Sequence, residues 1–149
     1  MLVKGFYPIA FAKACRNLGF IVSEDLLEEV NRLNPNGSAP ADLFFQLVKE
    51  ISNAYSSPGP VLRRVGEEMM ELWYRNEENP PARGVDFLEL QRESEGYKLT
   101  HSMEEEEAGT FILTSHDMIH GKATIRSRTP FPREMEEGII YGEIGRAHV

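Results

Sequence analysis

The first half of the chain carries apolar residues at the spacing of helices. The clearest case is segment 43–55, in which large apolar side chains recur at steps of one, three and four residues and share one helical face. A second strong stripe occupies residues 61–73, and shorter stripes occupy residues 9–18 and 26–33. These stripes predict four helices, the last of which runs to about Glu78.

Residues at the ends of these segments support the same division. Pro8 suits the first turn of a helix and Gly19 suits its end, because glycine tolerates the left-handed conformation found there. Ser23 offers a hydroxyl that can cap the second helix, and the run NPNG at 34–37 ends that helix. SSPGP at 56–60 separates the third helix from the fourth.

From residue 84 onward the pattern changes to the period of strands, about 2 residues. The alternating segments are 85–92, 95–103, 109–115 and 121–128. In the second of them Tyr97 and His101 point to one side, and in the last Ala123 and Ile125 point inward. Strands at hairpin spacing predict an antiparallel sheet with one covered face.

The C-terminal segment 133–146, which follows a proline-marked corner, reads as a helix that contains several glycines. Gly138, Gly142 and Gly145 each cost roughly 1 kcal/mol relative to alanine inside a helix, which indicates that another backbone approaches closely. The simplest interpretation is packing against the sheet of the same chain. A partner helix or a ligand at this face is the alternative, and these three glycines are then the predicted interface.

The pattern as a whole predicts an α+β fold in a single domain spanning residues 1–149. Residues 1–79 form a mainly helical part, and residues 84–149 form a four-stranded antiparallel sheet and a closing C-terminal helix. The N-terminal helices pack on this sheet. With 149 residues and 41% hydrophobic content, the chain can bury one core of this size.

Composition narrows the function classes. The formal net charge of −8 argues against nucleic-acid binding, which depends on cations that neutralise phosphates. The lone Cys15 cannot form an intramolecular disulfide, which favours a cytoplasmic protein. No apolar run approaches the roughly 18 residues of a membrane span, and the opening segment lacks the cationic region of a signal peptide.

Common catalytic signatures are absent. The sequence contains no glycine-rich nucleotide loop after a strand, no nucleophile elbow and no paired CxxC, so an enzyme is the less favoured expectation. Ser115, His116 and Asp117 are consecutive and diverge along a strand, so they do not predict a catalytic triad. The glutamates of the last helix, Glu136 and Glu137 among them, are interpreted as a solvated face.

Two histidine patterns offer candidate chemistry. His116, Asp117 and His120 resemble the helical metalloprotease pattern, but they lie between two predicted strands, where a polar hairpin connection is the simpler interpretation and a transition-metal site the alternative. His101 shares a strand face with Tyr97. It is interpreted first as a core histidine, with a pocket-lining or haem-ligating role as the alternative.

The tail GKATIRSRTPFPREMEEGIIYGEIGRA at 121–147 resembles the C-terminal part of the vinyl-4-reductase domain. Relatives of that domain include haem nitric-oxide-binding domains and small transport-particle subunits. The resemblance extends from about Val85 and implies a ligand-binding or sensory module, or an assembly subunit with a lipid-accepting pocket. Phe131 and Pro132 stand where vinyl-4-reductase domains often carry cysteine. Of the Tyr-x-Ser-x-Arg motif of the haem-binding relatives only Ser127 is kept, so haem binding is an alternative and not the leading hypothesis.

Three functional hypotheses follow. The leading one is a cytoplasmic small-molecule-binding or sensory module with an apolar pocket between helices and sheet. Its predicted lining is Trp73, Tyr97, His101, Phe111 and Ile125. The first alternative is a non-catalytic interaction subunit, a homodimer or adaptor, that uses the glycine-stepped helix as its contact surface. The second alternative is a metal-dependent enzyme that uses the two histidines and the aspartate of the 116–120 segment.

Overall fold

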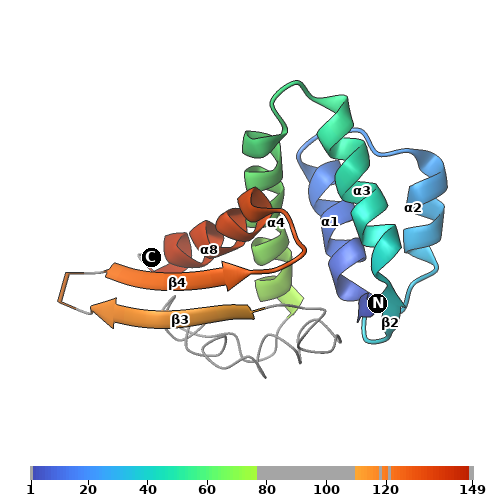
Figure 1. Cartoon of the computed structure of the whole chain (residues 1–149). Coiled ribbons are helices and arrows are strands. Elements are labelled where there is room, and N and C mark those ends of the chain that lie inside the picture. Colours follow the sequence, from blue (N-terminus) through green and yellow to red (C-terminus); the bar gives the residue numbers. More distant parts are fainter. Residues whose placement is uncertain (1, 77–109, 118, 121, 148–149) are drawn as a thin grey trace.

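A computed structural model describes residues 2–76, 110–117, 119–120 and 122–147 of the chain. Within these residues the chain forms five helices and two separate two-stranded sheets (Figure 1). In chain order the elements are β1 (Leu2–Lys4), α1 (Phe6–Asn17), α2 (Glu24–Asn31), β2 (Ser38–Pro40), α3 (Ala41–Ala54), α4 (Pro58–Asn76), β3 (Thr110–Asp117), β4 (Lys122–Arg128) and α8 (Arg133–Ala147).

The end of α1 confirms the expected role of Gly19. This glycine adopts a φ of 79°, in the left-handed region that favours glycine. The N–H of Gly19 donates to the carbonyl of Arg16 at 3.1 Å, and the N–H of Phe20 donates to the carbonyl of Cys15 at 2.8 Å. These two bonds satisfy carbonyls that the helix itself leaves without a partner.

Ser23 precedes α2 as expected, but its hydroxyl does not cap that helix. The hydroxyl donates instead to Glu50 Oε2 at 3.2 Å, and the Ser23 N–H donates to Glu50 Oε1 at 2.8 Å. Glu50 belongs to α3, so the carboxylate ties the start of α2 to the neighbouring helix. The sequence prediction of a side-chain cap is therefore wrong, because a tertiary partner takes the hydroxyl.

The first residues of the chain pair with the segment before α3. Strand β1 runs antiparallel to β2, with Val3 opposite Ala39, and both side chains are fully buried. Each strand has three residues, which is too short for a period of two to be recognised in the sequence. Through Val3, this small sheet contributes to the same buried cluster as the helices.

The core lies between α1, α3 and α4. Its largest fully buried side chains include Phe11, Phe44, Leu47 and Ile51, and the rings of Phe11 and Phe44 meet edge to face at 5.5 Å. Phe131, from the corner before α8, packs on Phe44 with ring centroids 5.6 Å apart. Burial of such a side chain stabilises a fold by about 1.5–3 kcal/mol, so Phe131 anchors the C-terminal corner to the N-terminal helices.

Helix α4 lies between the α1–α3 group and α8, and α4 and α8 pack closely (Figure 1). A Cβ atom at Gly66 of α4 would overlap the carbonyl oxygen of Met135, and one at Gly138 of α8 would overlap the carbonyl oxygen of Arg63. Gly142 faces Met70, whose Cβ lies 3.0 Å from the position of an added Cβ. For Gly138 and Gly142, the expected close backbone approach is confirmed.

Within the described residues, the glycines of helix α8 face helix α4 of the same chain. Gly138 and Gly142 thus have a partner surface within the molecule. Gly145 belongs to the same helix, in a part whose side chains lie outside the description.

The predicted four-stranded sheet under the helices is wrong. In the described part of the chain, β3 and β4 pair only with each other, from Thr110 opposite Arg128 to Asp117 opposite Lys122. The fold is mostly helical, and its helices pack on one another. Helices that cover a sheet pack on an apolar face of that sheet. On β4 only Ile125 is half-buried, and the other side chains of this strand are exposed. The predicted strands 85–92 and 95–103 lie outside the described residues.

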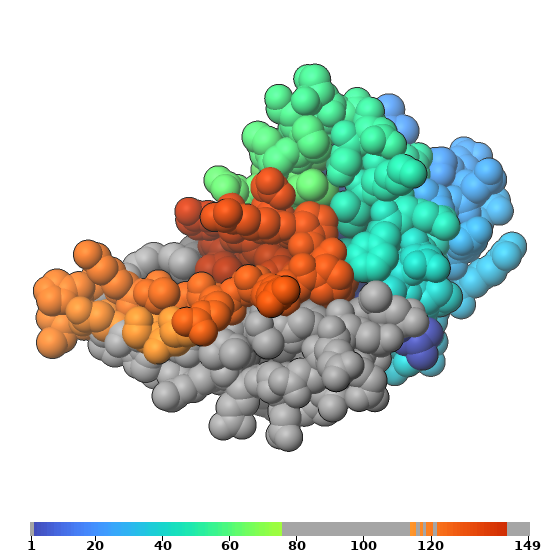
Figure 2. All heavy atoms as spheres, in the orientation of Figure 1, coloured from blue at the N-terminus to red at the C-terminus, as the bar shows by residue number. Residues whose placement is uncertain are grey.

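The β3–β4 hairpin extends beyond the helices at one edge of the molecule (Figure 2). Its bounds agree with the alternation seen at 109–115 and 121–128, and a register shift interrupts the pairing between Leu113 and Ser115. Among the helices in the described ranges, none is both long and apolar enough to cross a bilayer.

Candidate functional site

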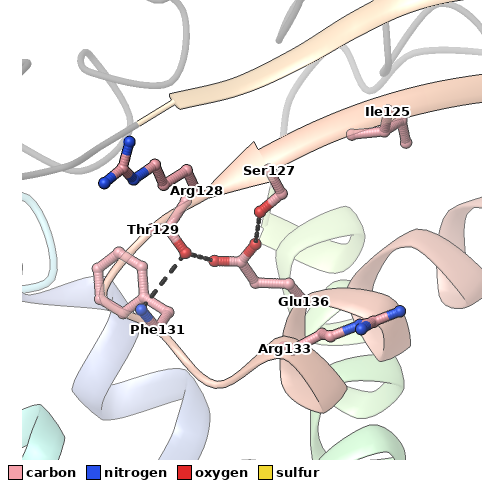
Figure 3. A pocket seen from close by; sticks show the side chains of 7 residues that line it. All are labelled: Ile125, Ser127, Arg128, Thr129, Phe131, Arg133 and Glu136. Carbon is pink, nitrogen blue, oxygen red and sulfur yellow. Dashed lines mark hydrogen bonds between the residues drawn. The ribbon is translucent and has the colours of Figure 1, made fainter.

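A cavity of about 380 Å³ lies where β4 turns into α8. Its walls come from the end of the strand, the corner and the first turn of the helix (Figure 3). The lining residues are Ile125, Ser127, Arg128, Thr129, Phe131, Arg133 and Glu136. This volume falls at the lower end of the range of small-molecule sites, roughly 300–1,000 Å³.

Local sequence explains how these residues meet. Alternation along β4 places Ile125 and Ser127 on one side of the strand. Pro130 and Pro132 then interrupt the extended chain, since each ring fixes φ and removes a backbone donor. The N–H of Glu136 donates to the carbonyl of Pro132 at 3.1 Å, which starts α8 directly after the corner.

Glu136 is the buried charged residue of this site, with 8% of its surface exposed. The Ser127 hydroxyl donates to Glu136 Oε2 at 2.9 Å, and the Thr129 hydroxyl donates to Oε1. Thr129 Oγ1 in turn accepts the N–H of Phe131 at 3.3 Å. Because a buried carboxylate is costly without hydrogen-bond donors, the two hydroxyls hold it in place and define the shape of the corner.

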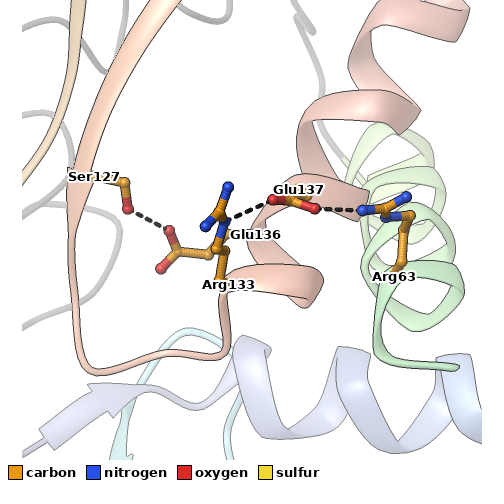
Figure 4. A network of polar contacts seen from close by, with 5 residues as sticks. All are labelled: Arg63, Ser127, Arg133, Glu136 and Glu137. Atoms are coloured by element: carbon orange, nitrogen blue, oxygen red, sulfur yellow. Dashed lines mark hydrogen bonds and ion pairs between the residues drawn. The ribbon is translucent and has the colours of Figure 1, made fainter. Parts of the chain in front are cut away.

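A second carboxylate ties the cavity rim to α4 (Figure 4). Glu137 accepts from Arg63 Nη2 of α4 at 2.5 Å and from Arg133 Nε at 2.8 Å. The guanidinium of Arg63, and then that of Arg133, holds the pKa of Glu137 below its usual value. Arg63 also lies over the ring of Tyr141, 5.5 Å from its centroid, so α4 and α8 are joined beside the cavity.

Two of the five predicted pocket residues, Ile125 and Trp73, have described side chains, and one of these two lines this cavity. Ile125 does so, and Ile125 and Trp73 both pack against Met70, which places the two predicted residues at one apolar cluster. Tyr97 and His101 lie outside the described residues. Phe111 belongs to β3 and pairs with Ser127, but its side chain is outside the description.

The sequence interpretation missed Glu136, which was assigned to a solvated face and is buried. Glu137 belongs to the same stretch and is half-buried within an ion-pair network. The available signal was the pair of hydroxyl residues, Ser127 and Thr129, at alternate positions of the strand end just before the helix. These two hydroxyl groups indicate a polar partner. That the partner is Glu136 follows only from the corner, which brings the first turn of α8 back over the strand.

The predicted metal residues lie at the far end of the hairpin. His120 Nδ1 is 2.6 Å from Asp117 Oδ2, while Asp117 Oδ1 accepts the N–H groups of Ile119 at 3.0 Å and His120 at 3.2 Å. The hydrogen bond from the His120 side chain lowers the pKa of Asp117. His116 pairs with Ala123, and its side chain is outside the description. Among the described residues, no three histidine, cysteine or acidic side chains gather as a metal site would require.

Comparison of the chain with protein-family models, with curated proteins and with solved structures gives no match.

Proposed function

We propose that the protein is a small-molecule-binding module whose site is the cavity between β4 and the first turn of α8. The observation that carries this proposal is the combination of a cavity of about 380 Å³ with a buried carboxylate, Glu136, on its wall. Binding sites for small molecules combine apolar walls with a few placed polar groups. Ile125 and Phe131 supply the first, and the Ser127–Glu136–Thr129 group supplies the second.

The location suits a sensory role as well as simple binding. The cavity is lined by residues of the strand, the corner and α8, and Arg133 of its rim pairs with Glu137, which also pairs with α4. A ligand that contacts this rim therefore has a route to the α4–α8 packing. The resemblance of residues 121–147 to vinyl-4-reductase domains points in the same direction.

The test is ligand binding by the full chain. We expect a member of a small-metabolite library to raise the melting temperature and to remain bound in native mass spectrometry. A ligand at about 100 times its dissociation constant stabilises the folded state by about 2.7 kcal/mol, which a melting curve resolves.

A cavity-filling variant locates the site. Ser127→Phe places a ring where the cavity lies, and it should abolish the shift caused by the ligand. Thr124→Phe is the matched control, because Thr124 is an exposed residue of the same strand that does not line the cavity. Folding of both variants is checked by circular dichroism. A ligand that binds Ser127→Phe as well as the wild type would show that this corner is not the site.

A further inference from the structure

The β3–β4 hairpin carries a charge opposite to that of the rest of the chain. Residues 110–128 contain three cations, Lys122, Arg126 and Arg128, and one acid, Asp117, so this segment has a net charge of +2 with neutral histidines. The whole chain has a net charge of −8, and subtracting +2 leaves −10 for the remainder. Because the hairpin projects beyond the helices (Figure 2), its charge is presented away from the acidic body.

The cations of β4 lie on the outward side of that strand. Alternation places Ile125, which packs against Met70 of α4, on the inner side. Lys122, Arg126 and Arg128 therefore face the other way, and all three are exposed. Among the described residues, none of these three side chains takes part in an ion pair or a hydrogen bond. This side of the strand is called the cationic row below.

Helix α2 presents the opposite charge in the same condition. Its eight residues include four acids and no base. The acids form two pairs at a spacing of four residues, Glu24 with Glu28 and Asp25 with Glu29, and all four are exposed. In the described part of the chain, their side chains also lack an ion pair or hydrogen bond. Like charges at this spacing destabilise a helix, so cations brought to this face would stabilise α2.

The two surfaces match in spacing. Neighbours on one side of a strand are two residues apart, which separates Arg126 from Arg128 by about 6.7 Å. Residues four apart in a helix are about 6 Å apart along its axis, which is the separation of Glu24 from Glu28 and of the second acidic pair. A strand laid along α2 therefore brings successive arginines to successive turns of acids.

Each charged surface is accompanied by an exposed isoleucine. Ile119, in the turn of the hairpin, is 90% exposed, and Ile21, just before α2, is 80% exposed. They are the two most exposed large hydrophobic residues in the described part of the chain. Burial of either side chain would add an apolar contribution to an ionic contact. Figure 1 places the turn of the hairpin and α2 at opposite ends of the molecule, so the two surfaces cannot meet within one chain.

We propose that the protein self-associates head to tail, with the cationic row of one copy docked on α2 of a second copy. The contact joins two different surfaces, so its repetition produces rings or open chains. Exposed ion pairs are individually weak and are screened by salt, so this association requires high protein concentration and low salt. The surface is separate from the glycines of α8, which face α4 of the same chain.

Neutralising each surface tests the proposal. Lys122→Gln/Arg126→Gln alters the hairpin outside the cavity lining, and Glu28→Gln/Glu29→Gln alters α2 at exposed positions. In sedimentation velocity at about 200 µM protein and about 20 mM salt, the wild type should form dimers and larger species, and about 0.5 M salt should dissociate them. Each variant alone should be monomeric at the lower salt concentration, with a circular dichroism spectrum like that of the wild type.

The α2 variant separates a specific contact from general charge effects. Removal of two acids changes the net charge from −8 to −6, which lowers the general repulsion between copies, yet the proposal requires loss of association. Lys13→Gln/Lys49→Gln is the matched control for the hairpin variant, because it removes two exposed cations from α1 and α3. This control should associate as the wild type does.

An equimolar mixture of the two variants gives the sharpest result. One variant keeps an intact hairpin and the other an intact α2, so the mixture should form dimers that grow no further. A wild type that stays monomeric at low salt would overturn the proposal, as would a monomeric mixture or a control that dissociates like the hairpin variant. If the monomeric wild type instead binds vesicles of phosphatidylglycerol and phosphatidylcholine, and Lys122→Gln/Arg126→Gln does not, the cationic row faces a membrane and not a second copy.

Discussion

Replacing Gly66 with alanine tests the close packing of α4 on α8. A methyl group at this position would overlap the carbonyl oxygen of Met135 and lie 3.0 Å from the amide nitrogen of Ile139. That second distance is 0.4 Å short of the 3.4 Å at which ordinary contact begins, and the overlap with the oxygen is more severe. Both neighbours are backbone atoms of α8, so no side-chain rotation relieves the overlap and the two helices must separate.

Two opposing effects determine how Gly66→Ala changes the free energy of unfolding. Alanine is favoured over glycine inside a helix by about 1 kcal/mol. Overpacking typically costs about 1–3 kcal/mol, and a rigid backbone neighbour places Gly66→Ala at the upper end. We expect a net loss of about 2 kcal/mol. For a chain of 149 residues this corresponds to a fall of about 4–8 °C in melting temperature.

The assay is thermal and urea denaturation followed by circular dichroism. Gly59→Ala is the matched control, because Gly59 lies in the same helix and an added Cβ would be 3.4 Å from the Cγ of the flexible Glu134 side chain. That variant should be at least as stable as the wild type. If Gly66→Ala is as stable as Gly59→Ala, helix propensity outweighs packing and the α4–α8 backbone contact is not as close as described.

Two further predictions concern titratable groups. Arg63 and Arg133 lower the pKa of Glu137 in the folded protein. Its ion pairs therefore stabilise the fold fully at pH values above the pKa of a glutamate in the unfolded chain, about 4.3. This stabilisation is lost as the pH falls through the lower pKa of the folded state. The melting temperature of Glu137→Gln should therefore lie below that of the wild type at pH 7 and approach it at pH 3; a constant difference across this range would contradict the assignment. Burial raises the pKa of Cys15 to about 12, so the folded protein should not react with a disulfide reagent at pH 8, whereas the urea-unfolded chain should react at once. Rapid labelling without urea would show that Cys15 is accessible.

Local signals in the sequence were reliable where neighbouring residues decide the structure. The stripes of apolar residues located α1 to α4 within a few residues, and alternation located β3 and β4. Gly19 ended α1 because the left-handed backbone that closes a helix is a property of that residue. Gly138 and Gly142 of α8 also gave a correct expectation, close approach of a backbone, because their cost inside a helix requires compensation from packing.

The candidate site was predicted only in part, for a reason that its residues make clear. Ile125 was placed on the inward side of a strand, and it lines the cavity. Glu136 was assigned to solvent because a glutamate in an acidic helix carries no local mark of burial. Its carboxylate accepts from Ser127, at the end of β4, and from Thr129, in the corner that follows, and these hydroxyls reach it only because the proline corner folds α8 back.

By itself the sequence located the helices α1, α2, α3, α4 and α8 and the strands β3 and β4 to within a few residues. Within the described residues, the tertiary structure decided what each helix packs against: α4 for α8, and chiefly the neighbouring helices for the N-terminal core. Periodicity reports the direction in which side chains point along one element, because bond geometry sets it locally. The partner in that direction depends on the burial, steric fit and hydrogen bonds of residues far apart in the chain, which no single segment contains.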